Sequence, residues 1–188
     1  MITHNQLVPS EWVVRFASNI PQKDSAPCRV LDYACGSGRH ALYLQGVGYL
    51  VLALDRDHIS LQELQNSLDV SKPFPMELRC IDLEQEKYAL EDENELFAGI
   101  IVTNYLYRPH LSRLFYQLMI GGVLIYETFA IGNERYGKPS NPNFLLQENE
   151  LLDIAMSKKF HIMAFEQLEV TLPKPAVIQR ICAVKTQD

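Results

Sequence analysis

Short apolar runs alternate with segments of helical periodicity along most of the chain. The runs at residues 29–33, 49–54, 76–81, 99–103 and 123–128 are separated by turns and by segments with helical spacing. A strand that is buried on both faces gives a continuous apolar run, and strands that alternate with helices are typical of a parallel sheet. The pattern therefore predicts an α/β fold built on a parallel sheet.

The helical segments have recognisable start and stop signals. Ser10 can cap a helix over residues 11–19, and Gly121 and Gly122 are expected to stop a helix that covers about 110–120. Other helices are expected at 39–46, 58–68 and 148–158, a solvated, irregular helix in the acid-rich stretch 84–95, and a closing hairpin at 160–170 and 176–185.

A glycine-rich turn follows the first apolar run. Residues 30–40 read Val-Leu-Asp-Tyr-Ala-Cys-Gly-Ser-Gly-Arg-His. Gly36 and Gly38 have no Cβ, so the backbone there can approach a ligand closely, and the N–H groups of the next helix face the same space. Asp55 ends the second run 19 residues after Gly36, near the offset of about 20 at which an acid reaches a ribose hydroxyl. The pattern predicts a site for a nucleoside cofactor.

Charge at the strand ends separates the possible cofactors. Gly36, Gly38 and Ala41 also fit the G-x-G-x-x-A pattern of dinucleotide sites, but Asp32 lies four residues before Gly36. A carboxylate about 4 Å from a ligand charge interacts with it by roughly 4 kcal/mol in a partly shielded site. Asp32 would repel a pyrophosphate and attract the cationic amino group and sulfonium of S-adenosylmethionine (SAM). Asp82, after the third run, is a candidate acceptor for the adenine amino group.

With these motifs the chain resembles the class I SAM-dependent methyltransferases and, more narrowly, the small bacterial group similar to tellurite-resistance methyltransferases. The resemblance covers nearly the whole chain and rests on residues 30–40, on Asp55 and on three further segments. These segments are Val-Thr-Asn-Tyr-Leu-Tyr-Arg-Pro at 102–109, Gly-Gly-Val-Leu-Ile-Tyr-Glu-Thr-Phe at 121–129 and Gly-Asn-Glu-Arg-Tyr-Gly-Lys-Pro-Ser-Asn-Pro at 132–142.

The resemblance implies a Rossmann-like, seven-stranded, mostly parallel sheet in the order 3-2-1-4-5-7-6, with strand 7 antiparallel and helices on both faces. It also implies a single domain over residues 1–188, with residues 1–28 as an N-terminal helical cap. Ligands of such sheets bind beyond the carboxyl ends of the strands. The residues expected to bind SAM are Trp12, Asp32, Ala34, Cys35, Gly36, Ser37, Gly38, Asp55, Arg56, Asp82, Leu83 and Asn104.

The segment after the fourth strand is the candidate acceptor site. Methyl transfer from a sulfonium mainly needs alignment and desolvation of the nucleophile and, in some reactions, removal of a proton. Asn104, Tyr105 and Tyr107 occupy the position at which amino-methylating relatives carry Asn-Pro-Pro-Tyr. The absence of the two prolines disfavours an exocyclic amine of a base as acceptor. Tyr105, Tyr107 and His110 are candidate catalytic residues, with aromatic packing and helix capping as the alternative interpretations.

Several neighbouring residues have two interpretations each. His40 can act as a base or cap a helix, and Arg39 and Arg108 can hold an anionic substrate or remain solvated. Trp12 can touch the cofactor or pack the first helix. The loop at 132–144 is rich in Gly, Asn and Pro and long enough to form a lid or a plain surface loop.

Composition narrows the classes of function. A chain of 188 residues with 47% hydrophobic content suits one domain with a sizeable core. The net charge of −6 and the lack of a basic run argue against nucleic acid as a partner. The four cysteines show neither a C-x-x-C pair nor metal-ligand spacing, so we expect reduced thiols, no metal and a cytoplasmic location. No apolar run approaches the roughly 20 residues of a membrane-spanning helix.

The sequence thus predicts a SAM-dependent methyltransferase with a small-molecule acceptor and with neither nucleic acid nor membrane as a partner. It leaves the acceptor and the oligomeric state open. Two alternative functions remain open. One is an NAD-dependent oxidoreductase, which Asp32 disfavours, and the other is a non-catalytic SAM-binding sensor or partner subunit, suggested by the lack of a clear base or nucleophile in the motifs.

Overall fold

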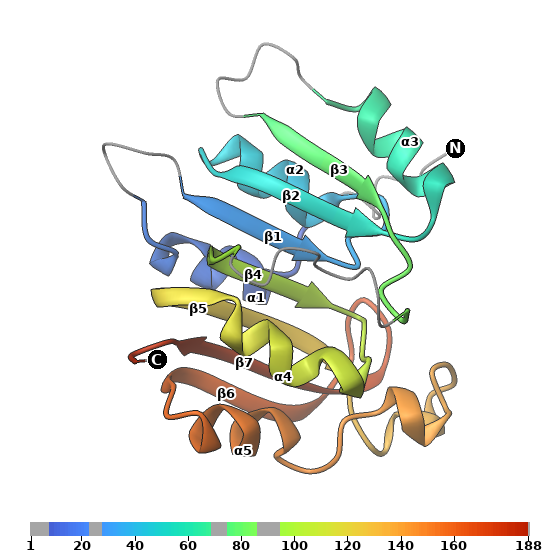
Figure 1. Ribbon diagram of the computed structural model, residues 1–188. Helices are drawn as coiled ribbons and strands as arrows, with labels where there is room; N and C mark the ends of the chain where they lie inside the picture. The colour runs from blue at the N-terminus through green and yellow to red at the C-terminus, as the bar shows by residue number, and fades with distance from the viewer. Residues whose placement is uncertain (1–7, 23–27, 69–74, 86–94, 188) are drawn as a thin grey trace.

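The computed structural model describes residues 8–22, 28–68, 75–85 and 95–187, and seven strands form one sheet (Figure 1). The strand order is β3-β2-β1-β4-β5-β7-β6. β1 to β5 run parallel to one another, whereas β7 runs antiparallel to both β5 and β6. The predicted order and the antiparallel seventh strand are confirmed.

The elements alternate along the chain as the pattern predicts. The strands are β1 (Arg29–Tyr33), β2 (Leu50–Asp55), β3 (Met76–Cys80), β4 (Phe97–Thr103), β5 (Leu118–Phe129), β6 (His161–Val170) and β7 (Ala176–Val184). The helices are α1 (Glu11–Phe16), α2 (Arg39–Gly46), α3 (His58–Asn66), α4 (Arg108–Tyr116) and α5 (Glu150–Ser157), with short 3-10 turns η2 (Ala17–Asn19), η3 (Asn133–Arg135) and η4 (Pro142–Phe144).

The N-terminal helix begins at the predicted cap. The Ser10 hydroxyl accepts a hydrogen bond from the Trp12 N–H, and this contact satisfies one of the free N–H groups of the first turn. Regular α-helix ends at Phe16 and continues as the 3-10 turn Ala17–Asn19. The predicted helical segment therefore exists but tightens in its last turn.

One predicted boundary is wrong. The expected helix over 110–120 ends at Tyr116, and Gly121 and Gly122 lie inside β5 instead of stopping a helix. The Gly121 N–H donates to the Lys185 carbonyl, and a Cβ on Gly122 would come within 2.8 Å of the Met119 carbonyl oxygen. Met119 belongs to β5 itself, and Gly121 has a φ of +80°, so the glycine pair marks an irregularity within β5, where its register with β4 shifts. The local sequence does not distinguish this irregularity from a helix stop.

Helices cover both faces of the sheet, as predicted. Phe16 of α1, Leu44 of α2 and Leu64 of α3 belong to one buried apolar cluster. Leu114 of α4 and Leu151 of α5 belong to the cluster on the opposite face. The two layers leave the carboxyl ends of the parallel strands as the edge at which a ligand can reach the sheet (Figure 1).

Two further expectations concern segments that are only partly described. The solvated helix expected at 84–95 falls mostly on residues 86–94, which lie outside the described residues. Within the described ranges, no helix has the length and apolar character that crossing a membrane requires.

Candidate functional site

A cavity of about 340 Å³ opens at the carboxyl ends of the parallel strands. Its size falls in the range of about 300 to 1,000 Å³ that is usual for small-molecule sites. The wall comes from the segments that follow β1, β2, β3 and β4, from the end of β5 and from the β5–α5 loop (residues 130–149). The lining residues are Ala34, Asp55, Arg56, Asp82, Leu83, Glu84, Asn104, Tyr105, Leu106, Thr128, Phe129, Pro139 and Phe144.

The two glycines of the turn after β1 have different roles. Gly36 has a φ of +54°, and no heavy atom lies within 4 Å of the position that its Cβ would take. Gly38 has a φ of +78°, and a Cβ there would come within 2.4 Å of the Leu64 side chain. Gly38 therefore allows close packing of α2 on α3, while Gly36 leaves open space into which a ligand can fit.

The acids at the ends of β2 and β3 are oriented by local hydrogen bonds. Asp55 accepts from the Gly36 N–H at 2.7 Å and from the Asp57 N–H at 2.9 Å. Asp82 accepts from the Glu84 N–H at 3.0 Å and from the Gln85 side chain at 3.2 Å. Both carboxylates line the cavity, and each has an orientation fixed before any ligand arrives.

Asp32 is a buried carboxyl group with an unmet hydrogen-bonding capacity. It is 1% exposed, it accepts from the Ala41 N–H, and its Oδ2 atom has no partner in the described part of the chain. Burial raises the pKa of Asp32 to about 7. An unsatisfied buried polar group costs about 1–3 kcal/mol, so a cationic group next to this oxygen would remove a penalty that the free protein carries.

Two non-glycine residues with left-handed backbone line the same cavity. Ala34 has a φ of 60° and Asn104 a φ of 54°, and they follow the adjacent strands β1 and β4. The Asn104 N–H donates to the Glu127 carbonyl at 2.9 Å, which fixes the turn against β5. Such conformations cost of order 1–3 kcal/mol and concentrate at ligand sites. The two strained positions therefore support the same ligand site as the open turn at Gly36 does.

The three candidate catalytic residues occupy different environments. Tyr105 lines the cavity, its buried hydroxyl has no partner among the described residues, and burial raises its pKa well above the usual value. Tyr105 is therefore a neutral hydrogen-bond donor. The Tyr107 hydroxyl donates to the Glu84 carbonyl at 3.0 Å, and His110 Nδ1 lies 3.3 Å from the Tyr33 hydroxyl. Of the three, only Tyr105 lines the cavity, and all three catalytic roles stay predictions.

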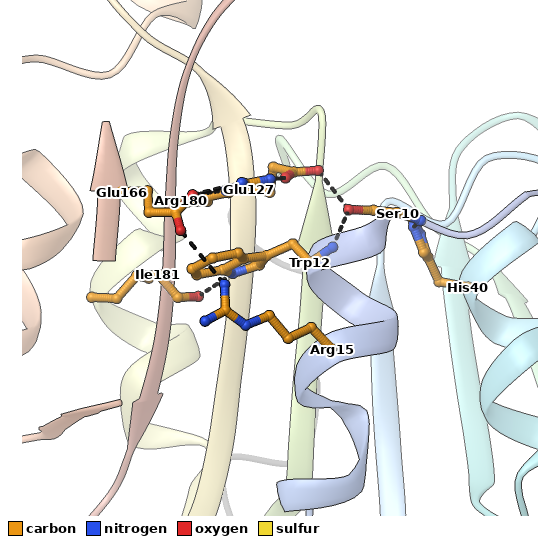
Figure 2. Close-up of polar contacts among 8 residues, drawn as sticks. All are labelled: Ser10, Trp12, Arg15, His40, Glu127, Glu166, Arg180 and Ile181. Carbon is orange, nitrogen blue, oxygen red and sulfur yellow. Dashed lines mark hydrogen bonds and ion pairs between the residues drawn. The ribbon is translucent and has the colours of Figure 1, made fainter. Parts of the chain in front are cut away.

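His40 connects the start of α1 to β4. Its Nε2 accepts from the Ser10 N–H at 3.1 Å (Figure 2), and its Nδ1 lies 3.3 Å from the Thr103 hydroxyl. Burial lowers the pKa of His40 to about 3, so the ring stays neutral. Because both ring nitrogens have partners, the structure favours a structural role over that of a base.

Trp12 packs α1 against the sheet. Its indole N–H donates to the Ile181 carbonyl at 3.1 Å, and the Arg180 guanidinium lies 4.5 Å from the ring centroid (Figure 2). Arg180 also pairs with Glu127 at 3.2 Å, and Glu127 accepts from the Ser10 hydroxyl at 2.8 Å. Trp12 is therefore part of a buried network that fixes α1, and it does not line the cavity.

The cavity wall overlaps with the predicted site only in part. Seven predicted residues line it: Ala34, Asp55, Arg56, Asp82, Leu83, Asn104 and Tyr105. Eight predicted residues do not: Trp12, Asp32, Cys35, Gly36, Ser37, Gly38, Tyr107 and His110. Six lining residues were not predicted: Glu84, Leu106, Thr128, Phe129, Pro139 and Phe144. Glu84 and Leu106 are neighbours of predicted residues, Thr128 ends a predicted strand and Phe129 directly follows it. Pro139 and Phe144 carried no signal beyond their place in a possible lid.

Known proteins with similar sequences or folds agree with this architecture. A relative from Haemophilus influenzae, described as a probable SAM-dependent methyltransferase TehB, is 25% identical over 130 residues, which are 67% of this chain and 44% of the relative. The crystal structure of TehB from Haemophilus influenzae matches with a TM-score of 0.76 at 21% identity, over 97% of this chain and 64% of that one. The structure of a SAM-dependent methyltransferase from Methanosarcina mazei matches with a TM-score of 0.68 at 16% identity, over 92% of this chain and 98% of that one.

These structural matches show the class I methyltransferase fold. The sequence match covers less than half of the Haemophilus influenzae relative, and the structural match covers less than two thirds of that protein. A family-level match, described as tellurite resistance protein TehB, covers residues 17–164 and so includes every residue that lines the cavity. Since this match extends over well more than half of the chain, the protein belongs to the TehB family.

Proposed function

We propose that this protein is a SAM-dependent methyltransferase that acts on a small-molecule acceptor. The observation that carries the proposal is the buried Asp32 carboxyl, whose Oδ2 atom lacks a partner in the described residues and which precedes the open turn at Gly36. An amino group would satisfy this oxygen, whereas a pyrophosphate would be repelled by it. Membership of the TehB family supports the same donor, because a relative is described as SAM-dependent.

The residues at the strand ends fit this donor. Asp32, which does not itself line the cavity, would attract the amino group of SAM by its charge. Asp55 would bind the ribose hydroxyls and Asp82 the adenine amino group, and Gly36 leaves the room that close approach requires. When bound, SAM supplies an electrophilic methyl group on a sulfonium. The protein contributes alignment and a site shielded from water, which together account for much of the acceleration of such a transfer.

Tyr105 is the proposed contact to the acceptor. Its hydroxyl is buried, lacks a partner among the described residues and belongs to a side chain on the cavity wall. Because burial raises its pKa, Tyr105 would donate a hydrogen bond to the acceptor and orient it, and would not remove its proton. Tyr107 and His110 would act indirectly, because they do not line the cavity. Tyr107 would act through its hydrogen bond to the Glu84 carbonyl, and His110 through its contact with the Tyr33 hydroxyl.

The organisation of the chain completes the proposal. We propose one domain over residues 1–188, with residues 1–28 as an N-terminal helical cap. A cytoplasmic location is consistent with four cysteines that carry free thiols, two of which, Cys35 and Cys182, are buried.

Two measurements test the function. Titration calorimetry with SAM, S-adenosylhomocysteine (SAH) and NAD should give binding of the first two and none of the third. Incubation with methyl-labelled SAM and a pool of small metabolites should then give a labelled product. Tight NAD binding without SAM binding would favour the oxidoreductase, and SAM binding with no transfer above background would favour a sensor.

A further inference from the structure

The two ends of the cavity differ in chemistry. The strand order places β3 and β5 on opposite sides of the pair β1 and β4, so the wall extends from a β3 end to a β5 end. The β2–β3 end carries charged groups, namely Asp55, Arg56, Asp82 and Glu84. The β4–β5 end and the β5–α5 loop contribute four apolar residues, Leu106, Phe129, Pro139 and Phe144, and the polar but uncharged Asn104, Tyr105 and Thr128. The donor proposed above would occupy the charged end, which leaves the apolar end for the acceptor.

Phe144 is an exposed aromatic side chain on a firmly held backbone. Its side chain is 50% exposed, but its backbone is held, because the carbonyls of the residues before and after it both accept hydrogen bonds from the Arg108 guanidinium. Arg108 Nη1 donates to the Asn143 carbonyl at 2.9 Å, and Nη2 donates to the Leu145 carbonyl at 2.7 Å. A half-exposed phenyl ring gives folding only part of its possible hydrophobic stabilisation, and a backbone that is already held loses little freedom when a ligand covers the ring.

Arg108 is itself held by a two-point ion pair. Its Nε and Nη2 atoms donate to the two carboxylate oxygens of Glu150, each at 2.8 Å. Charge-assisted pairs of this geometry are strong and directional. Since its donors already serve Glu150 and two carbonyls, Arg108 does not offer the free cation that an anionic substrate would need. The structure thus disfavours the interpretation of Arg108 as an anion holder.

The other apolar residues of this end are also held through their backbones. The buried Asn133 donates to the Pro139 carbonyl at 2.9 Å and accepts from the Val177 N–H of β7 at 3.2 Å. The Leu146 N–H donates to the Phe129 carbonyl at 2.9 Å. Contacts from three separate parts of the chain thus fix the apolar wall, so the subsite exists before a ligand binds.

The charged end disfavours a negatively charged acceptor. Asp55, Asp82 and Glu84 contribute three carboxylates, against one guanidinium from Arg56. Arg56 already lies 3.6 Å from Glu84, which takes up part of its charge. Among the described residues of the wall, the balance is negative, and an anion would be repelled as it enters.

From these observations we infer that the β4–β5 end is a preformed subsite for an uncharged acceptor with an apolar ring or chain. Phe144 determines this specificity, and Arg108 is a positioning residue that acts through the Phe144 backbone. The inference rests on the proposed function, since it assigns the acceptor side of the same cavity.

The test uses the whole chain and a matched pair of probes. Calorimetry first establishes binding of SAH, and the SAH-saturated protein is then titrated with 2-naphthol, with 2-naphthoate and with tellurite. We expect 2-naphthol to bind about tenfold or more tightly than 2-naphthoate, because the two share a ring system and differ in charge. Stronger binding of 2-naphthoate or of tellurite than of 2-naphthol would overturn the inference.

Variants of the loop make the test specific. Phe144→Ala should weaken 2-naphthol binding about tenfold and leave SAH binding unchanged. Tyr136→Ala is the matched control, because Tyr136 is a 40% exposed aromatic on the same loop that does not line the cavity. Equal affinity of the Phe144→Ala and unchanged proteins for 2-naphthol would refute the role of Phe144.

The positioning role of Arg108 needs a readout that a loss of stability alone would not change. Arg108→Lys keeps the charge but loses the two-point pair, so we expect weaker 2-naphthol binding, by about threefold to tenfold, at an unchanged SAH affinity. Glu150→Gln should have the same selective effect, and Glu148→Gln, on an exposed neighbouring acid, should have none. A parallel loss of SAH and 2-naphthol affinity would reduce Arg108 to a general structural role.

The outcomes separate this inference from the proposed function. Binding of SAH without binding of 2-naphthol contradicts the subsite alone. Binding of 2-naphthol that depends on Phe144, in a protein that binds neither SAM nor SAH, supports the subsite and contradicts the methyltransferase proposal.

Discussion

The two ends of the cavity are held in place in different ways. At the β2–β3 end, Asp55 and Asp82 accept from N–H groups two residues further along the chain. At the β4–β5 end, Arg108 reaches Glu150 across 42 residues, and Asn133 reaches Val177 across 44. The charged end is therefore shaped mainly by short-range turns, and the apolar end by tertiary contacts. Changes at the first end should affect donor binding alone, and changes at the second should act through the loop.

The largest expected effect is at Asp55. Asp55→Ala removes a charge-assisted contact to the donor, and we expect SAH affinity to fall by about tenfold to 150-fold, corresponding to about 1.5–3 kcal/mol. Titration calorimetry with SAH measures this change in affinity. Asp57→Ala is the control, because Asp57 caps α3 in the same turn without lining the cavity. An unchanged SAH affinity in Asp55→Ala would contradict the assignment of the charged end to the donor.

The next effect is a pH dependence that originates at Asp32. Its pKa in the free protein is about 7, and a bound cation would lower that value, so binding below pH 7 requires release of a proton. SAM affinity should therefore rise by up to about tenfold per pH unit towards pH 7 and level off above it. The comparison is the same titration of Asp32→Asn, which should show no such slope.

The raised pKa of Asp32 also predicts how the free energy of unfolding of the free protein depends on pH. Because the folded-state pKa is raised from 3.8 to about 7, the folded state binds the proton more tightly than the unfolded state. The free energy of unfolding should therefore fall as pH rises through this window. Denaturant titrations at several pH values should show that Asp32→Asn removes this contribution; an identical slope in both proteins would contradict the assignment.

A smaller effect is expected at Tyr105, where stability and turnover should move in opposite directions. Tyr105→Phe removes a buried hydroxyl that has no partner among the described residues, so the free protein should be as stable or slightly more stable. If the hydroxyl orients the acceptor, turnover should fall by about twofold to tenfold at unchanged SAH affinity. Equal turnover with an identified acceptor would leave Tyr105 with a packing role.

The smallest effect concerns a position away from both ends. Ser10→Ala removes the cap of α1 and the hydrogen bond to Glu127, at a cost of about 1 kcal/mol in the free energy of unfolding. SAH and 2-naphthol affinities should stay unchanged, since Ser10 does not line the cavity. A selective loss of SAH affinity in this variant would instead link the start of α1 to donor binding.

The fold followed from local patterns to a large extent. The run at residues 29–33 coincides with β1, and the helix predicted at 39–46 coincides with α2, because continuous apolar runs and glycine turns report directly on buried strands and helix starts. The prediction failed at Gly121 and Gly122, which mark an irregularity within β5 and not a helix stop. The sheet order came from family resemblance, since local pattern does not encode which strands become neighbours.

The glycine turn and the acids at the ends of β1, β2 and β3 could be predicted from the sequence alone, because each belongs to a short contiguous motif. Which of these groups are available for chemistry depends on tertiary contacts. Burial leaves an oxygen of Asp32 without a partner in the described chain and keeps His40 neutral, and the pair with Glu150 occupies Arg108. Phe144 reaches the cavity only because residues distant in sequence hold its backbone, and no periodicity within a loop records such contacts.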